Sequence, residues 1–384
     1  MSKKYQMCHN CVMDNVQDTT IKFDENGMCD SCKIFYKDVL PKWNYGNGHE
    51  EELKALIVKV KESGKGKKYD CLIGFSGGFD SAYLLHMAVN EWGLRPLVFH
   101  IDSGFDLPVG TNNIEKMVKK LGVELHNEHI DKDDMRNFQI AAFRTGLGGV
   151  LDTPQDHAFI AILDEYAVKH GIKYILNGYN TSTEAIANPE SHGRGCGKSS
   201  DKKFIKDVLR QHSPAPLKNY QFTNVIRRKI VLPYLKGVHV IKPLNLIPYV
   251  KKDVVDTLVR EYGYEPYEQK HFESLMTKFL EGYWLPKRFG FDVRNHQLSS
   301  LIITGQMTRD EALGILKAPP LSEEEGRDLF KQIADKLEIT EEELQEYMDM
   351  PLWENDSRYK TSDWMYKVGG KIMFTLGMDD RIRK

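Results

Sequence analysis

A pair of glycines flanked by serines is the part of this sequence best suited to chemistry. The segment Phe75-Ser76-Gly77-Gly78-Phe79-Asp80-Ser81 follows an apolar run and precedes apolar residues at helical spacing, which predicts strand, glycine turn and helix. Paired glycines let the backbone approach an anion, while the serine hydroxyls, the first-turn N–H groups and the helix dipole favour negative charge there. The segment therefore predicts a phosphate-binding loop, with Asp80 placed to hold a cation, and a chance turn is the alternative.

Four cysteines near the N-terminus have the spacing of a metal site. Cys8 and Cys11 form one pair and Cys29 and Cys32 form a second, with 17 residues between the pairs. Each pair places two thiolates on one tight turn, which fits a closed, tetrahedral, structural zinc site. A module this short would owe its fold to the metal, and the alternative is two pairs of ordinary reduced cysteines.

Composition limits the classes of protein that fit. The chain has 384 residues, 41% hydrophobic and 28% charged, with a net charge of −2. Its length predicts two or three structural units, and its balanced charge argues against a dedicated nucleic-acid binder. No apolar run reaches the ~20 residues of a membrane helix, and the first residues are too polar for a signal peptide. We therefore expect a cytoplasmic protein with no membrane partner.

Alternating strand and helix patterns predict the scaffold that positions the loop. They predict a doubly wound, mainly parallel α/β sheet, whose ligands lie at the carboxyl ends of the strands. The expected strands lie at residues 69–74, 96–102, 123–130, 174–178 and 239–244. The expected units are a zinc-ribbon module at 1–45, an α/β domain at 46–265 with a lid-like insertion at 187–216, and a helical region at 266–384. Capping boxes at Thr308 and Thr340 are expected to begin two of the C-terminal helices.

Polar residues gather where two of these strands should end. His100 and Asp102 follow the second strand, and Asn177-Gly178-Tyr179-Asn180 follows the fourth, with Glu184 shortly after. Carboxyl ends of parallel strands meet at one edge, so these residues are expected near the phosphate loop. A role as a loop cap or turn residue is the alternative for each of them.

Several basic residues could contact an anionic ligand. Arg194 and Lys198 lie in the insertion, Lys242 precedes Pro243, and Arg294 follows an irregular aromatic segment. The alternatives are solvated loop charges for Arg194 and Lys198, a surface lysine for Lys242, and a helix junction packed by aromatics for Arg294.

The loop resembles the SGGxDS pyrophosphate loop of the ATP pyrophosphatase (PP-loop) superfamily, whose members cleave ATP to AMP and pyrophosphate while adenylating a substrate. The resemblance implies that the ATP contacts are Phe75, Ser76, Gly77, Gly78, Asp80, Ser81, His100, Asp102, Asn177, Gly178 and Tyr179. It also implies Mg²⁺ near Asp80 and Glu184, and a phosphate contact from Lys242.

The ribbon, the loop, Asn177-Gly178-Tyr179-Asn180 and the tail segment Phe289-Gly290-Phe291-Asp292 together are similar to the N-acetyl sugar amidotransferases of bacterial surface-polysaccharide biosynthesis. This resemblance implies that ATP activates the acetamido oxygen of an N-acetyl sugar or nucleotide sugar, and that ammonia replaces it to give an acetamidino group. The surface glycans concerned are lipopolysaccharide O-antigen, capsule or flagellin glycan. The residues expected to contact the substrate are Asn180, Arg194, Lys198 and Arg294.

The source of ammonia is expected on another chain. An N-terminal nucleophile glutaminase needs a residue such as cysteine after Met1, where Ser2 stands; Cys71 lies within a predicted strand, and Cys196 lies in a loop. We therefore expect a separate glutaminase subunit, of the type that feeds histidine-biosynthesis cyclases, with or without a cyclase-like subunit. The competing interpretation is a tRNA sulfurtransferase of the same superfamily, which would need two catalytic cysteines, or three for an iron–sulfur cluster.

Overall fold

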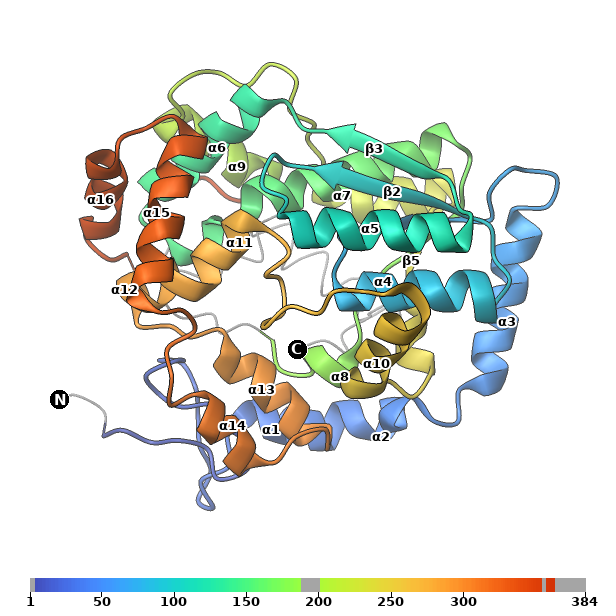
Figure 1. Ribbon diagram of the computed structural model, residues 1–384, viewed down its shortest axis with the longest axis horizontal. Coiled ribbons are helices and arrows are strands. Elements are labelled where there is room, and N and C mark those ends of the chain that lie inside the picture. Colours follow the sequence, from blue (N-terminus) through green and yellow to red (C-terminus); the bar gives the residue numbers. More distant parts are fainter. Residues whose placement is uncertain (1–3, 188–200, 354–356, 363–384) are drawn as a thin grey trace.

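The computed structural model describes residues 4–187, 201–353 and 357–362, and a parallel sheet lies at its centre (Figure 1). The sheet has the strand order β3-β2-β1-β4-β5, and all neighbouring strands pair in parallel. The strands are β1 (Cys71–Gly74), β2 (Pro96–Asp102), β3 (Leu125–His129), β4 (Tyr174–Leu176) and β5 (His239–Ile241). This order confirms the predicted doubly wound sheet. Winding reverses between β1 and β4, which is where ligands bind in such sheets.

Alternation along β1 explains why helices cover both faces of the sheet. Cys71 and Ile73 face one hydrophobic cluster, while Leu72 between them faces another. The helices α4 (Phe79–His86), α5 (Pro108–Leu121) and α10 (Lys251–Tyr262) lie on one side, and α7 (Thr153–Lys169) lies on the other (Figure 1). The other α-helices described before α10 are α1 (Asp30–Ile34), α2 (Leu40–Trp43), α3 (Glu50–Ser63), α6 (Lys132–Arg144), α8 (Thr181–Glu184) and α9 (Lys202–His212), and shorter π- and 3-10-helical segments, with η5 (Arg227–Lys236) the longest, lie between them.

The C-terminal helices share a core with the α/β part. The aromatic rings of Phe143 on α6 and Trp284 lie 4.6 Å apart, within a cluster that also holds residues of α7, α9 and α15. The helices are α11 (Leu275–Phe279), α12 (Leu285–Phe289), α13 (Arg294–Ile303), α14 (Arg309–Ile315), α15 (Glu323–Leu337) and α16 (Glu341–Asp349). The capping box that begins α14 is confirmed, and the Thr340 side chain caps α16. The division into three units stays a prediction. The hydrophobic core is continuous across the predicted boundary between residues 265 and 266.

Part of the predicted lid-like insertion is helical, and its role as a lid stays a prediction. Residues 202–212 form α9, whose Phe204, Ile205 and Val208 are buried in the core. Asp201 begins the helix by accepting hydrogen bonds from the N–H groups of Lys203 and Phe204. The Gly- and Ser-rich part of the segment obscured this helical spacing. Arg194, Cys196 and Lys198 lie outside the described residues.

The cysteine module packs against the C-terminal region. The N–H of Val12 donates to Ser299 Oγ at 3.2 Å, and the Arg309 guanidinium donates to the carbonyls of Cys8 and Cys11. Figure 1 shows α1 and α2 beside α13 and α14 at the bottom of the molecule. Within the described ranges, no helix has the length and apolar character that crossing a membrane requires.

Candidate phosphate-binding site and metal centre

The Ser76–Ser81 loop has the geometry of an anion cradle between β1 and α4. Gly77 takes φ +83°, and a Cβ there would meet the Gly110 carbonyl oxygen at 2.7 Å, so only glycine fits. Gly78 caps α4, and its N–H donates to Ser76 Oγ at 3.2 Å. The Ser76 and Ser81 hydroxyls lie 3.3 Å apart. Backbone N–H groups, two hydroxyls and a helix N-terminus thus converge on one point, as phosphate binding requires.

A segment from Tyr264 to Ser274 crosses this loop, which sequence reasoning did not foresee. We call it the strap. Tyr264 donates its hydroxyl to the Gly77 carbonyl, and the Phe79 N–H donates to the Tyr267 hydroxyl at 3.2 Å. Ser76 Oγ donates to Glu273 Oε1 at 3.4 Å. The Glu273 carboxylate and the Tyr267 hydroxyl therefore accept hydrogen bonds from the Ser76 hydroxyl and the Phe79 N–H, which the loop would otherwise offer to an anion.

The environment of Glu273 disfavours the charged form of its carboxyl group. Burial raises the pKa of its carboxyl, and the nearby Asp80 charge raises it further. Its Oε2 atom is enclosed without a hydrogen-bond partner in the described structure. An anion that entered the cradle would displace this carboxylate.

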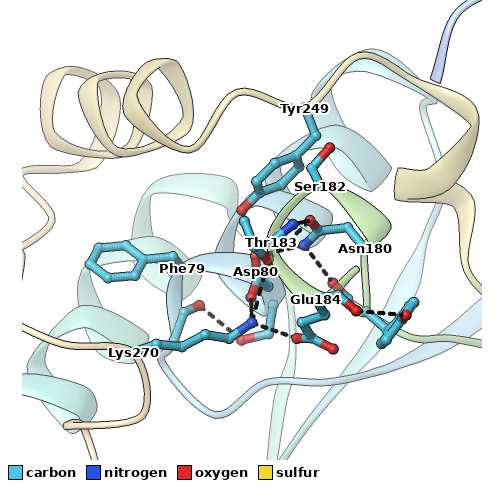
Figure 2. Close-up of polar contacts among 12 residues, drawn as sticks. Phe79, Asp80, Asn180, Ser182, Thr183, Glu184, Tyr249 and Lys270 are labelled. Carbon is cyan, nitrogen blue, oxygen red and sulfur yellow. Dashed lines mark hydrogen bonds and ion pairs between the residues drawn. The ribbon is translucent and has the colours of Figure 1, made fainter. Parts of the chain in front are cut away.

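Asp80 lies at the centre of a polar cluster on the first turn of α4 (Figure 2). Its Oδ1 accepts hydrogen bonds from Asn180 Nδ2 at 2.8 Å and the Tyr249 hydroxyl at 2.5 Å. Its Oδ2 pairs with Lys270 Nζ at 2.8 Å. Burial raises the pKa of the Asp80 carboxyl, but attraction to Lys270 and these hydrogen bonds outweigh it, so the pKa lies below its usual range. Asp80 is therefore ionised.

Lys270 joins the two carboxylates that were predicted as magnesium ligands. Its Nζ lies 2.5 Å from Glu184 Oε1 as well as 2.8 Å from Asp80 (Figure 2). Burial alone would lower the pKa of Lys270, but the two carboxylates raise it above its usual value. No sequence signal marked this lysine, because its partners lie 86 and more positions away. Only the fold brings them together.

The loop after β4 docks directly onto the phosphate loop. A Cβ on Gly178 would lie 3.1 Å from the Asp80 carbonyl carbon, so the two segments touch through their backbones. The fully buried Asn180 caps α8 by accepting from the Thr183 N–H, while its amide reaches Asp80. The structure thus unites Asp80, Asn180 and Glu184, as the strand-end argument expected.

A cavity of about 420 Å³ adjoins the loop at the carboxyl ends of β1 and β2. His100 lines it: its Nδ1 donates to the Phe75 carbonyl oxygen at 2.9 Å, and its Nε2 lies 2.8 Å from Asp106 Oδ2. Asp102 instead accepts from the Gly104 N–H at 2.6 Å and pairs with His129 on β3. Of the two predicted adenosine contacts, His100 faces the cavity, whereas Asp102 has the contacts of a loop cap.

The other predicted residues have mostly local contacts. Asn177 Oδ1 accepts from the Tyr179 N–H at 2.8 Å, and the Lys242 ammonium lies 4.3 Å from the centre of the Tyr179 ring. Arg294 is buried, pairs with Asp292 and donates to the Ala318 carbonyl. These are the contacts of a helix junction, which was the alternative for Arg294. Its role as a substrate contact stays a prediction.

The four N-terminal cysteines form one buried cluster. Their sulfur atoms all lie within 4.8 Å of one another, with Cys8 and Cys32 at 4.0 Å and Cys11 and Cys29 at 3.8 Å. Bonds of ~2.3 Å to one tetrahedral zinc ion would place neighbouring sulfurs about 3.8 Å apart. The N–H groups of Cys29 and Met13 donate to cluster sulfurs, which stabilises thiolates. The set fits a single metal ion.

His9 is next to Cys8 of the cluster but packs against a neighbouring turn. A Cβ on Gly27 would meet the His9 ring at 2.7 Å, so the imidazole covers the turn that precedes Cys29. That turn is built by Asp24, whose carboxylate accepts from the Asn26 and Met28 N–H groups. His9 therefore has a packing role there.

Comparison with known families gives this architecture a context. Residues 273–373 match the family described as LPS biosynthesis protein WbpG-like, C-terminal domain. Residues 273–373 are thus similar to a WbpG-like C-terminal domain. The match confirms the resemblance to surface-polysaccharide biosynthesis proteins, and it begins at Glu273, the strap residue that contacts Ser76. The WbpG-like domain thus reaches the phosphate loop itself.

Individual relatives are more distant. An uncharacterized protein of Methanocaldococcus jannaschii is 25% identical over 178 residues, 45% of this chain and 58% of that protein. The chain therefore spans little more than half the length of this curated relative. Among solved structures, the U34-tRNA thiolase NcsA from Methanococcus maripaludis with its [4Fe-4S] cluster is 16% identical, covering 81% of this chain and 88% of that chain, with a TM-score of 0.30. The NMN synthetase from Francisella tularensis is 13% identical. The match covers 59% of this chain and 99% of that chain, with a TM-score of 0.29. Likeness this low carries no argument about chemistry.

Proposed function

We propose that the chain is an ATP-dependent amidotransferase that converts the acetamido group of an N-acetyl sugar into an acetamidino group during bacterial surface-glycan biosynthesis. One observation carries the proposal: the first residue of the WbpG-like match contacts Ser76 of the anion cradle. A glycan-biosynthesis domain and a phosphate-binding loop therefore share one site.

The residues of the site suit the parts of such a reaction. The cradle would hold the β- and γ-phosphates, and the cavity beside it would take the adenosine. Carboxylates of Asp106, Asp152 and Asp156 line that cavity, where they suit the hydroxyl and amino donors of a nucleoside better than its phosphates. Asp80 and Glu184 offer oxygens of the type that Mg²⁺ prefers, and this ion would neutralise charge on the departing pyrophosphate.

The proposed chemistry balances without a protein nucleophile. The acetamido oxygen attacks the α-phosphorus of ATP, the bond to the β-phosphate oxygen breaks, and loss of the amide proton leaves an O-adenylyl imidate. Ammonia then adds to the imidate carbon, AMP leaves with the oxygen, and an acetamidine remains. Positioning and charge stabilisation would supply the catalysis. Ammonia would come from a separate glutaminase subunit, and the cysteine cluster would hold a structural zinc ion.

The test is a direct assay of product. The full chain is supplied with ATP, Mg²⁺ and ammonium, together with a panel of N-acetylated sugars and nucleotide sugars. We expect AMP and pyrophosphate in equal amounts, with a sugar product about one dalton lighter. Sulfur incorporation into tRNA, with no change in any sugar, would favour a sulfurtransferase instead. Binding of ATP without release of pyrophosphate across the panel would indicate a non-enzymatic nucleotide scaffold.

A further inference from the structure

The ammonium of Lys270 lies where a divalent cation bound to Asp80 and Glu184 would lie. It contacts Asp80 Oδ2 at 2.8 Å and Glu184 Oε1 at 2.5 Å, and Thr183 Oγ1 at 3.4 Å (Figure 2). A magnesium ion would need the same oxygens at ~2.1 Å. Ammonium and metal therefore exclude each other at these two carboxylates.

Asp80 Oδ2 is the atom for which Lys270 and a metal ion would compete. Oδ1 already accepts from two neutral donors, Asn180 and Tyr249, which hold the carboxylate in one orientation. The Lys270 side chain, by contrast, is a flexible four-carbon stem with a charge at its end. The carboxylate is rigid and its counter-ion is movable.

Lys270 belongs to the same segment, the strap, whose residues on either side of it contact the anion cradle. It lies in the strap between Tyr267, which accepts from the Phe79 N–H, and Glu273, which accepts from Ser76. An anion entering the cradle must displace the Glu273 carboxylate, and it brings negative charge close to the lysine. Phosphate oxygens can then partner the ammonium in place of the two carboxylates, so no buried charge is left unpaired.

We propose that Lys270 is an exchangeable counter-ion that closes the cation site of this protein until an anion occupies the loop. With the cradle free of phosphates, Lys270 holds Asp80 and Glu184 and keeps divalent cations out. When phosphates bind, its ammonium transfers to them and the carboxylates become available to the metal. The identity of that anion as a nucleotide triphosphate rests on the function proposed above, whereas the exclusion of the metal by Lys270 does not.

The experiment measures metal binding with no nucleotide present. Mn²⁺ is titrated into the full chain after its cysteine site has been filled with Zn²⁺, and free Mn²⁺ is read from its EPR signal. In Lys270→Met we expect one Mn²⁺ to bind at least about tenfold more tightly than in the wild type, because two carboxylates lose their cation. Lys270→Gln is a second neutral variant in case the first does not fold. Adding Glu184→Gln to either variant should remove most of the gain.

Lys251→Met is the matched control. Lys251 Nζ lies 6.0 Å from the centre of the Phe79 ring, and its charge interacts with that of Asp80. Its replacement also removes one positive charge near the site but does not free Asp80 Oδ2, so the gain in Mn²⁺ affinity should stay below about threefold. The proposal is overturned if wild type binds Mn²⁺ as tightly as Lys270→Met, if neither neutral variant binds it, or if Lys251→Met gains as much. None of these readings requires turnover, so a failure of the proposed amidotransferase reaction is seen separately.

Discussion

Replacing Gly78 by alanine tests the anion cradle with little disturbance of the fold. Gly78 has φ −76° and ψ 157°, which any L residue adopts. An alanine Cβ would lie 2.7 Å from Glu273 Oε1, 3.2 Å from Ser76 Oγ and 3.3 Å from the Tyr267 hydroxyl. The methyl group would therefore occupy the space where these polar groups converge. Because the Glu273 carboxylate is the end of a flexible side chain, it can move aside.

The expected effect on binding is large and the effect on stability is small. Losing one or two charge-assisted hydrogen bonds to phosphate costs ~1.5–3 kcal/mol, which weakens binding roughly 10- to 100-fold. Isothermal titration calorimetry with Mg-ATP and with inorganic pyrophosphate measures this loss. The free energy of unfolding should fall by less than about 1 kcal/mol, as read from thermal melting.

Gly77→Ala is the contrasting variant. Its φ of +83° costs an alanine about 1–2 kcal/mol, and its Cβ would meet the rigid Gly110 carbonyl at 2.7 Å. We expect a clear fall in melting temperature as well as weaker binding. The reasoning is refuted if Gly78→Ala folds normally and binds both ligands with wild-type affinity.

Three further outcomes are expected. Asp80→Asn should lower AMP formation by at least about a hundredfold, since one of the two carboxylates proposed to hold Mg²⁺ is lost, and metal analysis should show the cysteine site still filled. Cys29→Ser should lower the bound metal and the yield of soluble protein, because so small a four-cysteine module depends on its ion to fold. A soluble, metal-free variant of wild-type stability would contradict this. The third outcome concerns His100: burial lowers its pKa, but the hydrogen bond and charge of Asp106 outweigh this and raise it. Its pairing therefore contributes stability below the unfolded pKa of ~6.5 and loses it as pH rises through the folded value. Asp106→Asn should accordingly destabilise the protein by about 1 kcal/mol more near pH 6 than near pH 9, by denaturant titration. An equal loss at both pH values would contradict the charged pair.

Much of the scaffold was predictable because its signals are local. The apolar run before Ser76 predicted β1, and the alternating strand and helix patterns predicted the parallel sheet. The cysteine spacing predicted a cluster whose sulfurs do converge. The helix α9 was missed because a stretch rich in glycine and serine precedes it, although Asp201 is an ordinary N-cap.

The sequence by itself determined the phosphate loop, the cysteine cluster and the doubly wound alternation of strands and helices, since each depends on residues that are neighbours in the chain or on general rules of winding. Only the tertiary structure decided what surrounds the loop. Lys270 reaches Asp80 across 190 positions of chain, and Glu273 reaches Ser76 across 197. Contacts of this kind arise from packing between distant elements, which no local pattern encodes. The charge on the strap, and with it the proposed control of the cation site, is therefore a property of the folded chain.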